Sequence, residues 1–164
     1  MPADNHPLPR SPFQDPTLSD DDVLVRRLPE AHNAVGAPDP TTKVRTVSKS
    51  AWSSSSSRDD QYLGCSVDVL ADLKSQALDP YTDAYWKDVP VVLGVRVRDV
   101  RAIGSSILVG RDPRPGEPAH ASIWHQKNQG EPRALTQGQQ KRILAASFVI
   151  RPNDGSVQTM PLAP

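Results

Sequence analysis

Alternating apolar and polar positions are most regular between residues 91 and 126, and they predict the centre of the fold. In the run 91–97 every odd-numbered position is apolar, so these side chains would share one face of a strand. The runs 105–110 and 119–126 are also strand-like, and the segment between them, DPRPGEP, favours a turn because it holds three prolines and one glycine. We therefore predict three strands in this region.

Further strands are predicted outside this region. The run VLVRRL at 23–28 is rich in apolar and β-branched residues, 41–47 alternates weakly, and 148–150 would close the sheet as a terminal strand. Arg26 and Arg27 would lie on opposite faces of the first run. Either one of them points toward the packed side or a cleft, or the run is an edge strand with both arginines in solvent.

Helical spacing predicts the remaining elements. The clearest helix is 66–78, where Ser66 suits the N-cap and apolar residues recur at helical spacing. Other helical segments are predicted after Asp79-Pro80, at 98–103, and from the capping-box pair Thr136 and Gln139 to about residue 147.

These elements predict a compact α+β domain over residues 22–150, with a mixed or antiparallel sheet of about four to six strands packed with two or three helices. Residues 1–21 hold five prolines and are predicted to form a disordered arm, and 151–164 a disordered tail. The serine-rich segment 48–60 is predicted to be a mobile loop. Trp52 within it should fold back onto the domain or contact a partner.

The charge balance bears on partners. Lys plus Arg and Asp plus Glu number 19 each, whereas a nucleic-acid-binding domain normally carries a basic excess. We therefore expect no nucleic acid partner and no electrostatic attachment to a membrane. A single cysteine, Cys65, excludes an intrachain disulfide, and the N-terminal residues form no apolar signal segment. A cytoplasmic protein without a membrane span is the expectation.

His120 is the main candidate for a functional residue, because it follows the rigid proline-rich turn and opens a predicted strand. Alternatively, it is hydrogen-bonded to the neighbouring loop. Arginines could converge around it to bind phosphate or carboxylate, or form ordinary salt bridges with the interspersed aspartates. These arginines are Arg26, Arg27, Arg96, Arg98, Arg101, Arg111 and Arg114. The candidate catalytic residues are therefore His120, Arg26, Arg27 and Ser50, and the candidate binding residues are Arg96, Arg101, Asp112 and Trp52.

Several established motifs do not occur in the sequence. It contains no GxxxxGK[ST], no GxGxxG and no GxSxG. His120 and His125 are an odd number of positions apart, so their rings would face opposite sides of a strand and could not share a metal ion. We expect neither a metal site nor a cofactor.

The order of several short segments resembles a widespread set of small bacterial proteins, most of which have no assigned activity. Their pattern runs LYRRVP, S-x-x-F, LSVD, a GV strand, VR-x-x-G, DPxPxNPAHAxV and a basic closing helix. The matching segments here are LVRRLP (24–29), TVSKSAW (46–52), CSVDVL (65–70), a GV…VR…G run (94–104), DPRPGEPAHASI (112–123) and a final helix ending in SFVI.

This chain departs from the pattern at Val25, Trp52 and Glu117, where Tyr, Phe and Asn are usual. The resemblance implies functional pressure on Arg26 or Arg27, Ser50, Ser66, Asp112 and His120. A more distant likeness is to ADP-ribosyl-transfer folds, which place an Arg or His on the first strand, a serine on the next and an acidic residue late. Arg26 or Arg27 and Ser48 or Ser50 match the first two positions, and no late Glu on a strand matches the third.

Two classes of function remain open. The sequence shows no complete catalytic set, which favours a non-enzymatic accessory or protein-interaction module acting through His120 and the Trp52 loop, with another protein as its partner. The alternatives are a nucleotide- or NAD-directed enzyme or toxin, and an antitoxin or immunity partner. The enzyme hypothesis requires that Arg26 or Arg27, Ser50 and His120 line one cleft.

Overall fold

The computed structural model describes residues 11–54, 62–82, 88–128 and 131–159. Its centre is a seven-stranded sheet with the spatial order β5–β6–β3–β1–β4–β8, and β7 also pairs with β6. Each of these pairings is antiparallel. The strands are β1 (Val23–Leu28), β3 (Cys65–Val69), β4 (Val91–Arg96), β5 (Ile107–Arg111), β6 (His120–Gln126), β7 (Pro132–Arg133) and β8 (Phe148–Arg151).

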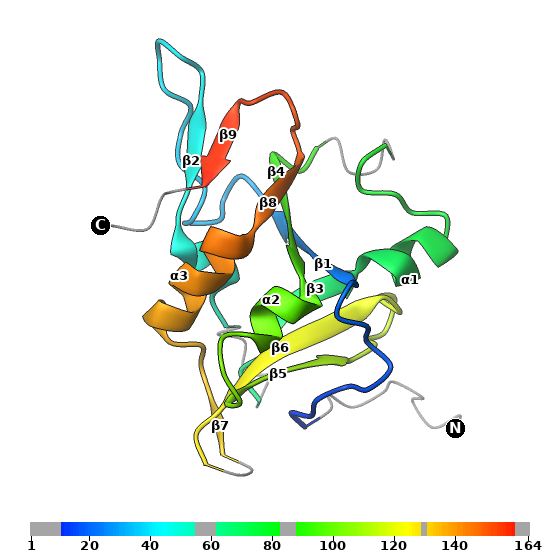
Figure 1. Cartoon of the computed structure of the whole chain (residues 1–164). Coiled ribbons are helices and arrows are strands. Elements are labelled where there is room, and N and C mark those ends of the chain that lie inside the picture. The colour runs from blue at the N-terminus through cyan, green and yellow to red at the C-terminus, as the bar shows by residue number, and fades with distance from the viewer. Residues whose placement is uncertain (1–10, 55–61, 83–87, 129–130, 160–164) are drawn as a thin grey trace, which may run out of the picture.

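Helices cover both faces of this sheet (Figure 1). On one face, α1 (Leu70–Ser75) packs Leu73 into a cluster with Val25 and Val92. On the other face lie α2 (Val97–Arg101), α3 (Gln137–Ala146) and the 3-10 helix η1 (Lys49–Trp52), which contribute to a larger apolar cluster. Burial of these apolar side chains holds the layers together. The predicted α+β class is confirmed.

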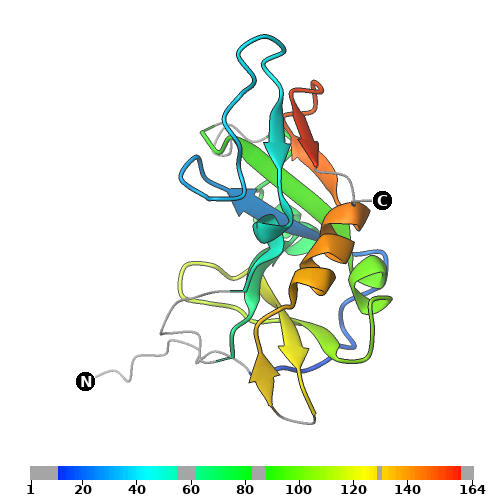
Figure 2. The same cartoon turned by 90° about the vertical axis from the view of Figure 1, so that its left-hand side faces the viewer.

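A second, two-stranded sheet joins segments from opposite ends of the chain. Strand β2 (Arg45–Val47) pairs in parallel with β9 (Val157–Thr159). Both views place this sheet at the end of the molecule away from β6 and β7 (Figures 1 and 2). The predicted disordered tail at 151–164 is therefore wrong for residues 151–159, because backbone pairing orders a segment that has little apolar surface.

Local signals predicted some elements well. Strand β1 has the predicted bounds, and its full length pairs with β4. Because it also pairs with β3, it is a central strand, not an edge strand. Helix α3 begins at Gln137, and its N-cap is Thr136, whose side chain accepts from the Gln139 backbone while the Gln139 side chain accepts from the Thr136 backbone. This capping box was predicted.

The predicted helix at 66–78 is wrong over its first four residues. Cys65–Val69 is strand β3, and the helix begins only at Leu70. Strand β3 pairs with β6 along most of its length and with β1 near its end. Alternating side chains on two faces, with partners on both sides, overrode the local helical spacing. The helix predicted after Pro80 starts as a turn, and its later positions lie outside the described residues.

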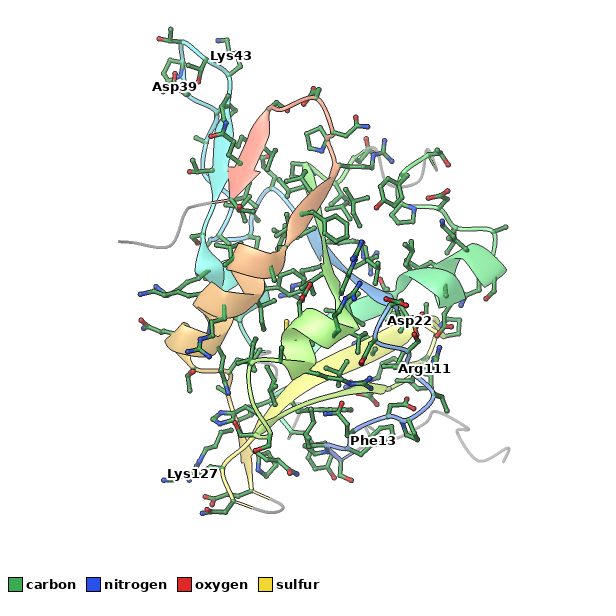
Figure 3. All side chains as sticks on the ribbon, viewed as in Figure 1. Phe13, Asp22, Asp39, Lys43, Arg111 and Lys127 are labelled. Atoms are coloured by element: carbon green, nitrogen blue, oxygen red, sulfur yellow. The ribbon has the colours of Figure 1, made fainter. Side chains whose placement is uncertain are left out.

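The predicted disordered arm at 1–21 is wrong for residues 11–21, which lie along the outer edge of β5. The Asp15 N–H donates to the Val109 carbonyl at 3.0 Å, and the Val109 N–H donates to Gln14 Oε1 at 3.2 Å. The Phe13 ring lies 5.8 Å from the Trp124 ring, and Figure 3 shows Phe13 at this edge. Hydrogen bonds to an otherwise unpaired strand edge compensate for the low apolar content.

The serine-rich segment is ordered at its start. Lys49–Trp52 forms η1, so the prediction of a mobile loop over 48–60 is wrong there, and residues 55–61 lie outside the described part of the chain. Trp52 folds back into the core and is 0% exposed. None of the described helices is long and apolar enough to span a membrane.

Candidate functional site

Strands β1 and β3 pair only at Leu24–Val69 and Val25–Asp68. Beyond this point the two strands separate, and a hollow of about 130 Å³ opens between them, which we call the first hollow. Its lining comes from three parts of the chain, namely β1, β3 and the turn that leads into β6. The lining residues are Val25, Arg26, Arg27, Ser66, Val67, Asp68, Glu117 and His120.

Arg26 connects the separated strands on the packed side of β1. Its Nε donates to the Ala51 carbonyl at 2.9 Å, and its Nη1 donates to the Ser66 carbonyl at 2.7 Å. The guanidinium therefore supplies donors to a backbone carbonyl of β3 where the ladder with β1 has stopped. Arg26 stabilises the split between β1 and β3.

Arg27 lies on the opposite face of β1, next to two carboxylates. Its Nε is 3.8 Å from Asp68 Oδ2, and its Nη2 is 3.5 Å from Glu117 Oε1. Glu117 is brought there by a tight turn, in which Arg114 and Glu117 form a bridge and Gly116 adopts a φ of 72°. Such a left-handed residue is readily supplied by glycine. The arginines of the predicted pair thus face opposite sides, one toward the packed core and one toward the charged wall of the hollow.

His120 is held with a defined hydrogen-bonding polarity. It is 5% exposed, and its Nδ1 lies 2.7 Å from the Asp112 carbonyl oxygen. A carbonyl oxygen only accepts, so Nδ1 carries the proton and Nε2 of the neutral ring has a free lone pair. The Asp112 carboxylate in turn accepts from Arg114 Nη2 at 2.7 Å and from Ser122 Oγ at 3.2 Å. This arrangement fixes the loop that orients the imidazole.

Asp68 pairs across the β3–β6 ladder with His120, so the two side chains project from the same face of the sheet. Asp68 is only 8% exposed. Burial raises the pKa of its carboxyl group, and the nearby charges of Arg27 and His120 oppose this rise only in part. A buried carboxyl group with a raised pKa beside an imidazole is a pairing typical of proton-transfer sites.

The other arginines do not converge on His120. Arg101 binds the N-terminal segment through Asp20 and the Asp15 carbonyl, and Arg111 pairs with Asp72. Figure 3 shows Arg111, at the end of β5, near Asp22, which belongs to the N-terminal segment. Arg96 lines a separate hollow with Tyr81 and Phe148, two of the exposed large apolar residues. For Arg101 and Arg111 the salt-bridge interpretation fits better than a common anion site, and Arg96 lies at a different place in the fold.

Two other candidates also lie outside the first hollow. Ser50 is in η1 and shares a hydrogen bond with Ser48 at 2.8 Å between their hydroxyl oxygens. It is not among the residues that line the first hollow. Trp52, proposed as a binding residue, is buried in the core and cannot contact a partner in this conformation. Burial likewise raises the pKa of the Cys65 thiol, which fits a structural cysteine.

Two residues of the site, Asp68 and Glu117, were not among the predicted functional residues, and Ser66 was indicated only by the resemblance to the bacterial proteins. The segment 66–78 was predicted to be a helix with Ser66 as its N-cap. Reading 65–69 as a strand would have placed Ser66 and Asp68 on one face. Glu117 was noticed only as a departure from the bacterial pattern, and the sequence contains no signal that brings it next to Arg27.

The donor set does not suggest a resident metal. In the described part of the chain, no group of three or more His, Cys, Asp or Glu side chains is arranged to hold a metal ion. Comparison of the chain with protein-family models, with curated proteins and with solved structures finds no match. We therefore infer function from the geometry of the site itself.

Proposed function

We propose that this protein is an enzyme that binds a small polar molecule in the first hollow and uses Asp68 and His120 as an acid–base pair. The observation that carries the proposal is their shared position: both side chains are buried, they are cross-strand partners, and they line one hollow with Arg27. The cleft predicted for the enzyme hypothesis is not met at Ser50, which does not line the first hollow, whereas Arg26, Arg27 and His120 do. The enzyme proposed here therefore uses Asp68 in place of Ser50.

The reaction class supported by this pair is hydrolysis. The free Nε2 of His120 takes a proton from an attacking water molecule, whose oxygen forms the new bond. Protonated Asp68 gives its proton to the leaving oxygen as the old bond breaks. The imidazolium then returns a proton to the Asp68 carboxylate through solvent, which restores both groups. Arg27 is placed to stabilise negative charge that develops between them.

Turnover by matched variants tests this proposal. Nucleotides, NAD, phosphate esters and glycosides would be assayed between pH 5 and 8 with the native chain, D68N, H120N and the control D72N. Asp72 is a paired carboxylate outside the first hollow. D68N and H120N are expected to lower kcat by about 100-fold or more, as general acid–base groups do, while D72N retains activity. Folded D68N and H120N proteins with native turnover would contradict the proposal.

A non-enzymatic accessory protein, or an antitoxin or immunity partner, is the alternative. It has less support because His120 and Trp52, its expected contact residues, are buried. A substrate that is turned over with the variant pattern above excludes it. Recovery of a stoichiometric protein partner by pull-down from the native host, with binding unaffected by D68N and H120N and with no turnover, favours it.

A further inference from the structure

A second hollow adjoins the first and extends the site toward α1. Its volume is about 250 Å³, and it shares Arg27, Asp68 and Glu117 with the first hollow. The two volumes, 130 and 250 Å³, are each below the size of an ordinary ligand pocket, which begins at about 300 Å³, and together they pass it. One ligand lying across the shared residues would therefore fill a pocket of ordinary size.

The two hollows differ in chemistry. The second has an apolar wall formed by Leu73, Leu78, Pro118 and Ala119, and Gln76 is the uncharged polar side chain in its lining. The first has His120 and Ser66 beside the arginines. A ligand that fits both therefore has a flat or apolar part with a polar edge at one end and a polar, reactive part at the other.

The shared residues define what lies in the middle. Asp68 presents the carbonyl oxygen of its protonated carboxyl group and Glu117 presents a carboxylate, and Arg27 lies within 3.8 Å of the first and 3.5 Å of the second. These acceptors are poorly suited to a phosphate at this point, because the Glu117 carboxylate would repel it. They are well suited to neighbouring hydroxyl groups, which donate to carboxylate oxygens and accept from a guanidinium.

We propose that the substrate is a ribonucleoside 5′-phosphate, with the base against Leu73 and Leu78, the ribose hydroxyls on Asp68 and Glu117, and the phosphate ester in the first hollow, where its bond to O5′ is the one that is hydrolysed. This assignment rests on the proposed function, since it names the substrate class of the same site. An amide side chain such as Gln76 pairs well with the edge of a base, as glutamine does in nucleic-acid recognition.

Binding to four ligands tests the assignment, with calorimetry on the full chain. The ligands are adenosine, 2′-deoxyadenosine, adenosine 5′-monophosphate and ribose 5-phosphate. Adenosine is expected to bind at least 10-fold more tightly than the deoxy analogue, because removal of a hydroxyl leaves an acceptor oxygen of the site without its donor. The monophosphate is expected to bind at least as tightly as adenosine, because its phosphate occupies the first hollow, and clearly weaker binding would overturn the assignment.

A pair of leucine variants locates the base. L78A is expected to weaken adenosine binding by about 10-fold, the effect of removing apolar contact area, and to leave ribose 5-phosphate unchanged. L70A is the matched control, because Leu70 is a partly buried leucine on the neighbouring helix α1 that does not line either hollow. If L78A does not fold, Q76A replaces it, since Gln76 is exposed and its removal should reduce discrimination between bases.

The possible results separate the two proposals. Equal binding of adenosine and its deoxy analogue, ribose 5-phosphate binding as tightly as the nucleotide, or no binding of any of the four ligands overturns the substrate class and leaves the acid–base proposal to its own test. Nucleoside binding with the expected variant pattern, together with turnover that survives D68N and H120N, supports the ligand class and overturns the acid–base roles.

Discussion

Asp15 and Asp68 are two buried carboxylates in different surroundings, and their pKa values shift in opposite directions. Asp15 is 3% exposed, and burial alone would raise its pKa, but hydrogen bonds from Thr17 and the Arg111 backbone outweigh burial and lower it. Burial raises the pKa of Asp68. Its ion pair with Arg27 is long, at 3.8 Å, and the described residues supply no hydrogen bond to its carboxyl group.

The two residues also occupy different kinds of break in the sheet. Asp15 belongs to the segment that closes the outer edge of β5, where Asp15 Oδ2 accepts from the Arg111 N–H at 3.0 Å. Asp68 is at the point where β1 and β3 separate. The edge of β5 is hydrogen-bonded by residues of the N-terminal segment, whereas the gap between β1 and β3 forms the first hollow. We infer that a buried carboxylate with all its donors in place serves the fold, whereas one without them is available for chemistry.

The largest expected effect is the loss of the Asp15 carboxylate. Asp15→Ala removes acceptors from the Thr17 N–H and hydroxyl, at 2.8 and 2.6 Å, and from the Arg111 N–H. Leaving such donors unsatisfied is expected to reduce the free energy of unfolding by about 3 kcal/mol. Urea denaturation measures it. Asp21→Ala, in the same segment but exposed, is the control. An equal loss of stability in both variants would contradict the structural role of the Asp15 carboxylate.

The next largest effect is expected at Arg26, whose guanidinium donates hydrogen bonds where β1 and β3 separate. Arg26→Met retains an apolar stem but leaves the Ala51 and Ser66 carbonyls without their charged donor, and we expect a loss of about 2 kcal/mol in unfolding free energy. Arg98→Met breaks an exposed ion pair with Asp21 and should change it by less than about 0.5 kcal/mol. A loss in Arg26→Met no larger than in the control would show that the split needs no such support.

A smaller effect appears in the pH dependence of stability. Because the folded pKa of Asp68 is above the ordinary value, the native state holds its proton more tightly than the unfolded state. The contribution of Asp68 to the free energy of unfolding is therefore fully present below about pH 4, the ordinary carboxyl pKa. It is lost as the pH rises through the raised pKa of the folded state. The difference in Tm between D68N and the native chain should therefore shift in favour of D68N as the pH increases.

Asp15→Asn should show the opposite sign. Its lowered pKa gives stability that is present above the ordinary carboxyl pKa and is lost as the pH falls through the folded value. The Tm of the native chain should therefore increase relative to that of Asp15→Asn as the pH rises. Thermal melts of both variants between pH 3 and 7 measure the two slopes, and slopes of the same sign would contradict the contrast between the carboxylates.

The smallest stability effect is expected at Glu117. Its ion pair with Arg27 is exposed, with 36% and 48% of the two side chains accessible, so solvent screens it. Glu117→Gln should change the free energy of unfolding by less than about 0.5 kcal/mol in a urea titration. The same substitution removes a carboxylate from both hollows and should weaken ligand binding. A large loss of stability would assign Glu117 to the fold.

The parts of the fold that could be predicted are those whose cause is local. The capping box at Thr136 and the β-branched run of β1 each act through residues a few positions apart. Strand β3 could not be separated from a helix in this way, since its pairing with β6 joins segments that are distant in sequence. Likewise, the low apolar content of residues 11–21 does not reveal that the edge of β5 supplies their hydrogen bonds.

The candidate site was predicted only in part for the same reason. His120 was found because a proline-rich turn precedes it, and Arg26 and Arg27 because adjacent residues on a strand face opposite sides. Asp68 and Glu117 join them only through the register of β3 on β6 and the shape of the turn at Gly116. The register of β3 on β6 and the approach of this turn to Arg27 both depend on segments that are distant in the sequence.

The parallel pairing of β2 with β9 has a consequence for biosynthesis. Arg45–Val47 leaves the ribosome early, whereas its partner, Val157–Thr159, is among the last described residues to be made. Until then the nascent chain carries β2 without the neighbour it will have in the finished molecule. This small sheet should therefore be the last to gain amide protection when the newly made chain matures.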